Sequence, residues 1–298
     1  MKGGELLDVV RSGYTPVKAD TRLSVRFWGT RGSIACPGNE FEGYGGNTSC
    51  LEVRCGGQVL IFDAGTGLRP LGQKLTAEAE AAGEGVEAEI FLTHTHVDHI
   101  SGVPFFGPLF DPNSKINMHA GHLLPEKNLH DVLCKFMSAP LFPVPPQIFT
   151  AKVDFLDFRA GQTLHPGPEI TLRTAPLNHP NGATGYRVDF AGKSICYVTD
   201  TEHVPGSPDE NILKLIADAD IVIYDSSYTD EEFPRDVNWG HSTWQEGLRL
   251  VEQAGADQLL IFHHDPSHDD AFMDQIAKAA EEMRPGTQVA REGMLIEL

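Results

Sequence analysis

The chain has 298 residues, of which 41% are hydrophobic and 22% are charged, and this composition excludes a disordered or fibrous chain. Its formal charge of −19, from 42 acidic and 23 basic residues, repels polyanions, so we expect no large nucleic-acid footprint. No run of about 18 apolar residues occurs and residues 1–20 lack a signal-peptide core, so we expect a cytoplasmic protein with no membrane partner.

Strand-like runs recur along the chain, some alternating between apolar and polar residues and others continuously apolar. We predict strands at residues 23–29, 49–54, 58–63, 89–93, 115–119, 170–175, 185–190, 193–199, 220–225, 258–262, 288–291 and 294–297. Because a few helices separate them and no low-complexity linker occurs, the pattern predicts one domain, residues 1–298, with two stacked sheets and helices outside.

Helical segments fall between these strands. Residues 68–82 are rich in alanine and end at Gly83, a typical C-cap residue. Capping boxes that begin at Ser207 and Ser242 open two further helices. A last helix covers residues 270–283, and we expect its inward side to carry Phe272, Ile276, Ala279 and Met283.

Four metal-capable side chains follow the predicted strand 89–93, and they are His94, His96, Asp98 and His99. Their spacing fits two ions rather than one, because His94 and His96 can reach one ion while Asp98 and His99 turn toward a second. Imidazole and carboxylate ligands suit Zn²⁺, with Mn²⁺ or Fe as competitors. The cluster therefore predicts a dinuclear metallohydrolase.

Further ligands are expected downstream, where buried strands end at a sheet edge. Three residues meet this condition, and they are His179, Asp200 and His263. The choice between His263 and the adjacent His264 stays open. Residues 103–147 lie between the first cluster and these candidates, and we treat them as an insertion near the active site that supplies substrate contacts.

The HxHxDH pattern of residues 94–99, followed in order by His179, Asp200 and His263, resembles the metallo-β-lactamase superfamily. The resemblance implies an αββα sandwich of two mixed sheets with two metal ions at one edge. It also implies that Asp63, in the run Phe-Asp-Ala-Gly-Thr-Gly, orients a ligand histidine from behind. The implied ligands are His94, His96 and His179 for the first ion and Asp98, His99 and His263 for the second, with Asp200 bridging them.

Two further runs resemble the phosphodiesterase branch of that superfamily, which includes ribonuclease Z and the phosphoribosyl cyclic phosphodiesterases. Residues 28–33, Trp-Gly-Thr-Arg-Gly-Ser, resemble its GTxGS run, and residues 240–243, Gly-His-Ser-Thr, resemble its HST motif. The resemblance implies that His241 lies near the scissile phosphate and that Glu246 assists it. An aspartate at position 200, rather than a cysteine, argues against the drug-hydrolysing lactamases.

The position of His241 supports this role on physical grounds as well. It directly precedes a capped helix, whose free N–H groups and dipole favour an anion. A histidine there, with an unperturbed pKa of about 6.5, can donate a proton to a leaving oxygen at neutral pH.

The sequence thus favours a phosphodiesterase in which two cations about 3.5–4 Å apart share a water and present hydroxide to phosphorus. Asp98 would both bind metal and orient this nucleophile. We expect a small phosphorylated substrate, a cyclic nucleotide or cyclic sugar phosphate, because no long basic arm for gripping tRNA is visible. Hydrolysis of a lactone or thioester, and a non-catalytic metal-binding sensor, remain alternatives. A homodimer is suggested only by analogy to the branch.

Overall fold

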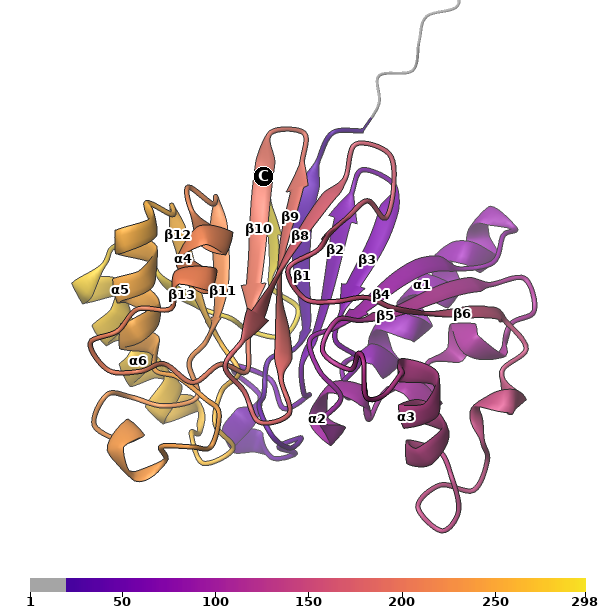
Figure 1. The fold of residues 1–298 in the computed structure, drawn as a ribbon, viewed down its shortest axis with the longest axis horizontal. Helices are drawn as coiled ribbons and strands as arrows, with labels where there is room; N and C mark the ends of the chain where they lie inside the picture. The colour runs from indigo at the N-terminus through magenta and orange to yellow at the C-terminus, as the bar shows by residue number, and fades with distance from the viewer. Residues whose placement is uncertain (1–19) are drawn as a thin grey trace, which may run out of the picture.

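The computed structural model describes residues 20–298; residues 1–19, in which we expected no signal peptide, lie outside this range. Two sheets of seven strands each face one another, with helices on the outer side of both (Figure 1). The predicted αββα sandwich of two mixed sheets is confirmed. Among residues 20–298, no helix has the length and apolar character needed to cross a membrane.

The first sheet has the strand order β14-β1-β2-β3-β4-β5-β6. Strands β3 to β6 run parallel to one another, whereas β14, β1 and β2 pair in antiparallel fashion. The strands are β1 (Leu23–Gly29), β2 (Cys50–Cys55), β3 (Gln58–Phe62), β4 (Glu87–Leu92), β5 (Lys115–Ala120), β6 (Lys152–Asp157) and β14 (Leu295–Glu297).

The second sheet has the order β13-β12-β11-β10-β9-β8-β7. Strands β10 to β13 are parallel, and β9 is antiparallel to both β10 and β8, so β8 runs in the same direction as β10. The strands are β7 (Thr163–Leu164), β8 (Thr171–Leu177), β9 (Ala183–Phe190), β10 (Lys193–Val198), β11 (Ile221–Asp225), β12 (Gln258–Phe262) and β13 (Gln288–Val289).

Aromatic side chains fill the space between the two sheets. Phe62 and Phe91 of the first sheet stack with ring centroids 5.6 Å apart, and Tyr186 of the second sheet lies 5.3 Å from Phe62. Tyr197 and Phe262 continue this layer, with centroids 5.5 Å apart. Burial of each large apolar side chain contributes roughly 1.5–3 kcal/mol, so this layer holds the sheets face to face.

Helices cover both outer faces of the sandwich. Leucines of α1 (Leu68–Ala82) and α3 (Leu129–Phe136) pack on the first sheet, and α4 (Glu210–Ile216), α5 (Trp244–Ala254) and α6 (Asp270–Met283) cover the second (Figure 1). The short helix α2 (Val97–Ile100) carries part of the histidine cluster. Short 3-10 turns occur at η1 (Asn39–Phe41), η2 (Val103–Phe105), η3 (Gly107–Phe110), η4 (Pro146–Ile148) and η5 (Phe233–Arg235).

All of the predicted strands are present, with ends that shift by one or two residues. Strands β6 and β7 were missed, because each lies at a sheet edge and contains no fully buried residue, which weakens the apolar signal. The segment 103–147 is not an insertion throughout. Its strand β5 lies between β4 and β6 and is an integral part of the first sheet.

The N-cap residues of α4 and α5 differ from those that the capping boxes predicted. Asp209, not Ser207, caps α4, because its side chain accepts hydrogen bonds from the second and third backbone N–H groups that follow. Thr243, not Ser242, caps α5 by accepting from the N–H of Glu246. In both helices the cap lies next to the helix, since only there does the side-chain oxygen reach an unpaired N–H.

The inward face of α6 agrees with the prediction except at its end. Ile276 is buried, Phe272 and Ala279 are partly buried against the core, and Met273 and Ala280 join them, whereas Met283 is 64% exposed. The helix ends at Met283, so that side chain extends past the sheet instead of packing on it.

Replacement of Asp209 by alanine should lower the free energy of unfolding by about 1 kcal/mol, because α4 loses its N-cap. Ser207→Ala is the matched control and should change stability by less than about 0.5 kcal/mol, since Ser207 is exposed. Urea denaturation of the three proteins measures both effects. A larger loss in Ser207→Ala would show that the capping box begins at Ser207.

Candidate metal centre

The predicted ligands gather at one edge of the sandwich because they follow strands that end there. His94 follows β4, and His179, Asp200 and His263 follow β8, β10 and β12. Since β8, β10 and β12 run in the same direction, their carboxyl ends meet at the same edge of the second sheet. The two edges then bring residues far apart in sequence within hydrogen-bonding distance of one another.

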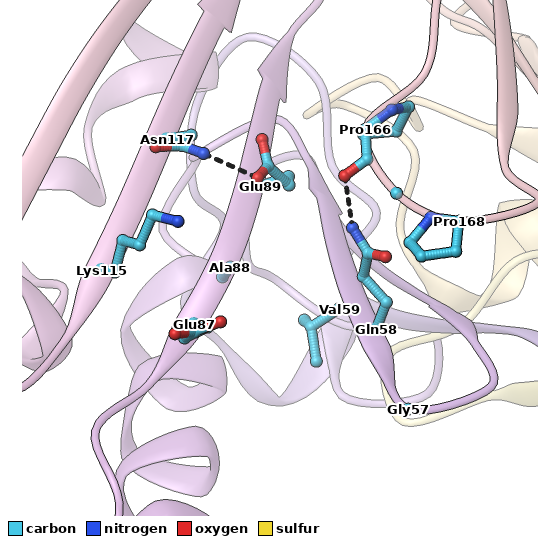
Figure 2. A pocket seen from close by; sticks show the side chains of 11 residues that line it. Gly57, Gln58, Val59, Glu87, Ala88, Glu89, Lys115, Asn117, Pro166 and Pro168 are labelled. Carbon is cyan, nitrogen blue, oxygen red and sulfur yellow. Dashed lines mark hydrogen bonds between the residues drawn. The ribbon is translucent and has the colours of Figure 1, made fainter.

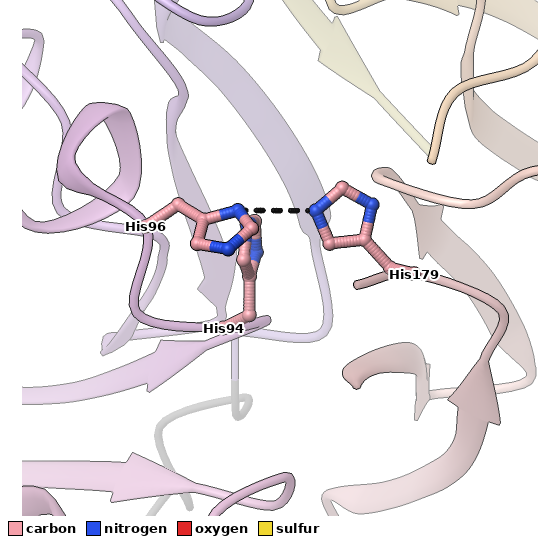
Figure 3. A group of neighbouring side chains, drawn as sticks. All are labelled: His94, His96 and His179. Atoms are coloured by element: carbon pink, nitrogen blue, oxygen red, sulfur yellow. Dashed lines mark hydrogen bonds between the residues drawn. The ribbon is translucent and has the colours of Figure 1, made fainter. Parts of the chain in front are cut away.

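Three histidines form the first ligand group, and Figure 3 shows their rings converging. The Nδ1 atom of His96 lies 3.1 Å from Nε2 of His179. The Nε2 atom of His94 is buried and forms no hydrogen bond with any described residue. Burial lowers the pKa of His94 well below its usual range, so its imidazole is neutral and able to donate a lone pair to a metal.

The second ligand group contains Asp98, His99, Asp200 and His263. The Nε2 atom of His99 lies 3.1 Å from Oδ2 of Asp98 and 3.2 Å from Oδ2 of Asp200. The Nε2 atom of His263 lies 3.6 Å and 3.3 Å from the same two oxygens. Both imidazole nitrogens are buried, and neither has a hydrogen-bond partner among residues 20–298.

Asp200 connects the two groups. Its Oδ1 atom lies 3.8 Å from Nε2 of both His94 and His179, whereas its Oδ2 atom faces His99 and His263. Each carboxylate oxygen therefore points to one group. This is the geometry that a bridging carboxylate requires.

The donor atoms fit two divalent ions. Ligands about 2.1 Å from a tetrahedral ion lie about 3.4 Å from one another. The donor pairs described above are 3.1 to 3.8 Å apart, and these distances bracket this value. Buried nitrogens without a hydrogen-bond partner are rare in proteins, and a cation at the centre of each group would satisfy them.

A hydrogen-bond network behind the ligands holds their orientation. The Oδ2 atom of Asp63 lies 2.8 Å from Nδ1 of His99, which leaves Nε2 directed toward the second group. Thr93 donates to Asp63 through both its N–H and its hydroxyl, and the hydroxyl of Tyr197 donates from the opposite sheet. Asp63 therefore lies where it can orient His99.

Three residues of this centre adopt a left-handed backbone. The φ angles are 59° at Asp63, 58° at Asp200 and 63° at His263. Non-glycine residues in this region cost of order 1 kcal/mol each and concentrate at functional sites. Asp63 and His263 directly follow a strand and Asp200 is two residues past one, so the sharp turn redirects each side chain from the sheet into the centre.

His241 lies beside this centre and pairs with a residue that the sequence analysis missed. Its Nδ1 atom is 3.0 Å from Oδ2 of Asp225, the last residue of β11. Burial alone would lower the pKa of His241, but the carboxylates of Asp225 and Asp200 raise it to about 9. An acidic residue at the end of a predicted strand was the available signal for Asp225.

Glu246, which we expected to assist His241, lies elsewhere. Its carboxylate accepts a hydrogen bond of 2.6 Å from Nε of Arg249, and its N–H belongs to the cap of α5. The helix turns this side chain toward its own next turn, away from the preceding loop. Asp225 therefore takes the position that the sequence assigned to Glu246.

The loop at residues 30–33 braces the second ligand group. The N–H of Ser33 donates to Oδ2 of Asp98 at 2.9 Å, and a Cβ atom added to Gly32 would collide with the ring of His263. Arg31 is fully buried and holds this loop through hydrogen bonds to the carbonyl oxygens of Gly45 and His268.

The open choice between adjacent histidines is decided by their hydrogen bonds. His263 faces the ligand group, whereas Nε2 of His264 donates to the carbonyl oxygen of Ala290, away from the centre. His122 also lies nearby, with Nε2 3.2 Å from the hydroxyl of Thr95.

A cavity of about 420 Å³ lies away from these residues (Figure 2). Its walls include Glu87 and Lys115, which begin β4 and β5, whereas the ligands follow the carboxyl ends of strands. Asn117 donates to Glu89 across it. This cavity is therefore at the opposite end of the sheet from the metal centre.

Gly32→Ala should reduce the metal bound at saturation from two equivalents to about one, because the new methyl group displaces His263 from the second group. Gly57→Ala is the matched control, since a Cβ atom there meets open space. Elemental analysis after dialysis measures the stoichiometry directly. Two equivalents retained in Gly32→Ala would contradict the assignment of His263.

Comparison with known proteins gives relatives over most of the chain. Ribonuclease Z from Myxococcus xanthus is 25% identical over 296 residues, which cover 85% of this chain and 92% of the relative. The metallo-β-lactamase fold protein YhfI from Bacillus subtilis aligns with a TM-score of 0.68 and 18% identity, over 93% of this chain and all of that one. The short form of human tRNase Z aligns with a TM-score of 0.61 and 20% identity, over 92% and 98% of the two chains.

These relatives contradict the prediction of a small phosphorylated substrate without a large nucleic-acid footprint. Two of the three are named as nucleases that act on RNA or tRNA. The prediction was wrong because it used the charge of the whole chain. A substrate meets the local potential, and cations held by buried ligands can invert that potential.

Residues 58–264 match the family described as the beta-lactamase superfamily domain, which is more than half of the chain. The match includes the ligand residues from His94 to His263. Members of this fold hold divalent metal ions, and the cluster described above can bind two. The chain therefore belongs to the metallo-β-lactamase superfamily, and the predicted metal-dependent hydrolase of its phosphodiesterase branch is confirmed.

Proposed function

We propose that the chain hydrolyses phosphodiester bonds of RNA at a dinuclear metal centre. The observation that carries this proposal is the position of Asp200, with one carboxylate oxygen toward each ligand group, beside the His241–Asp225 pair. The ribonuclease relatives support RNA as the substrate class. Specificity for a cyclic diester has no support in the contacts described above.

The donor set favours zinc. The ligands are imidazoles and carboxylates, which Zn²⁺ binds readily, and Mn²⁺ or Fe would compete according to availability. When bound, two such ions lower the pKa of a shared water and neutralise phosphoryl oxygens as charge develops. We assign His94, His96 and His179 to one ion and Asp98, His99 and His263 to the other, with Asp200 shared.

Asp98 can orient the attacking water. Its Oδ2 atom faces His99 and accepts from the N–H of Ser33. Its Oδ1 atom forms no hydrogen bond with any described residue, so it can accept a hydrogen bond from water. His99 and His263 lower the pKa of Asp98, against the effect of burial, and therefore keep it ionised at neutral pH.

His241 can supply the proton that the leaving oxygen needs. Asp225 engages Nδ1, which leaves Nε2 as the donor toward substrate. With a pKa of about 9, His241 is protonated at neutral pH. Asp225 is in turn fixed by the N–H groups of Thr201 and Ser227, so it is a positioning residue that orients the imidazole.

The two other hypotheses predict different outcomes. An acyl hydrolase would act on lactones or thioesters and leave phosphodiesters intact, and a sensor would bind metal and hydrolyse neither. The protonated His241 favours an alkoxide leaving group over a thiolate, which argues against a thioester substrate. A cytoplasmic location stays a prediction.

The zinc-loaded protein should hydrolyse bis(p-nitrophenyl) phosphate and a short single-stranded RNA, and a chelator should abolish both activities because the ligands act only through metal. Added Zn²⁺ or Mn²⁺ should restore them. Release of p-nitrophenol and gel electrophoresis of the RNA measure the two reactions. Turnover of acyl esters alone would overturn the phosphodiesterase proposal.

Asp225→Asn should lower kcat by roughly 10- to 100-fold, the usual effect of losing a partner that orients a functional histidine. His241→Gln should lower it by roughly 10²- to 10⁴-fold, because the proton donor is lost. Glu246→Gln is the control and should leave kcat within a few-fold of wild type. All variants should retain two metal equivalents, and an equal loss in Glu246→Gln would restore that residue as the partner of His241.

A further inference from the structure

A second cavity, of about 340 Å³, lies next to His241 and is separate from the metal ligands. Its walls include Tyr228, Glu232, Arg235, Asp236, Trp239 and Asp265. This volume lies within the range of small-ligand pockets, roughly 300–1,000 Å³. The cavity therefore has room for one nucleoside but not for a longer segment of a substrate.

Two contacts place this cavity on the proton-donor side of the centre. The ring of Tyr228 meets the ring of His241 edge-on, with centroids 6.1 Å apart. Trp239 is two residues before His241, and the intervening Gly240 accepts a hydrogen bond of 2.7 Å from the ligand His179. A group that occupies the cavity would thus lie beside the segment that carries His241.

The walls present aromatic surface. Trp239 is 68% exposed, whereas Tyr228 is buried. Backbone hydrogen bonds from Tyr228 to Ser242 and from Trp244 to Tyr228 fix the tyrosine beside the His241 segment. An exposed indole next to a fixed phenol is a surface on which a planar base can stack, and such stacking tolerates any base sequence.

The charges of the cavity disfavour a phosphate, because three carboxylates line it against the one guanidinium of Arg235. The carboxylates of Glu232, Asp236 and Asp265 line it and would repel a phosphate. Glu232 and Asp265 already accept hydrogen bonds from His268 and Ser267, so they are held in place as negative walls. Within residues 20–298 Arg235 forms no salt bridge, and it is exposed where it can meet the phosphate of a neighbouring nucleotide.

From these contacts we infer that the cavity between Tyr228 and Trp239 binds the nucleoside on the leaving side of the scissile phosphate. This inference rests on the proposed phosphodiesterase function. It adds that the departing alcohol is a nucleoside whose base stacks on Trp239. The remaining nucleotides of the RNA then extend away past Arg235.

Adenosine is the probe, because it is the leaving product without any phosphate. In the zinc-loaded protein it should inhibit hydrolysis of bis(p-nitrophenyl) phosphate competitively and quench tryptophan fluorescence with the same saturation constant. Ribose, which lacks the base, should do neither. Trp239→Ala should weaken inhibition by roughly 5- to 100-fold, as expected for loss of one base stack, and Trp239→Phe should largely restore it.

Phe110→Ala is the matched control, since Phe110 is also exposed but lies in η3 against α1 on the other side of the sandwich. It should leave the inhibition constant unchanged. Diester hydrolysis without inhibition by adenosine, or equal inhibition of wild type and Trp239→Ala, would overturn the subsite while leaving the phosphodiesterase intact. A dimer that Trp239→Ala converts to monomer in gel filtration would assign Trp239 to a subunit interface and likewise overturn it. Absence of any diester hydrolysis would instead reject the proposed function.

Discussion

The structure of the candidate site depends on the carboxylate of Asp200, which lies between two groups of buried histidines. One oxygen faces His94 and His179 and the other faces His99 and His263. Without bound cations, four imidazoles and a carboxylate in so small a buried volume would leave several polar atoms unsatisfied, which is costly. Packing of the two sheets around the site offsets this cost.

A path of hydrogen bonds through the core connects the two sheets to the metal site. Tyr197, on β10 of the second sheet, donates to Asp63 at the end of β3 in the first sheet, and Asp63 orients His99. The aromatic layer that holds the sheets together therefore also sets their separation at the site. A change in sheet packing would alter the distance between the two ligand groups, since each sheet supplies part of both.

The net charge of the chain and the charges at the site have different consequences for a substrate. The chain is strongly acidic as a whole, and the prediction drawn from that property, no large nucleic-acid footprint, is contradicted by the ribonuclease relatives. At the site the relevant charges are those of the expected cations and of the protonated His241. The acidic walls of the neighbouring cavity admit an uncharged base and repel a phosphate, so the two parts of a nucleotide occupy different positions.

The sequence by itself determined the features that depend on short spacing: the strand before the HxHxDH run, the order of the later ligands and the two-sheet class of the fold. These follow from periodicity and from ligands that lie within a few residues of one another. Only the tertiary structure decided between His263 and His264 and showed Asp225, rather than Glu246, beside His241. Those choices depend on a left-handed turn after β12 and on the end of β11, which brings Asp225 beside His241. Both depend on how segments distant in sequence pack together, so no local pattern predicts them.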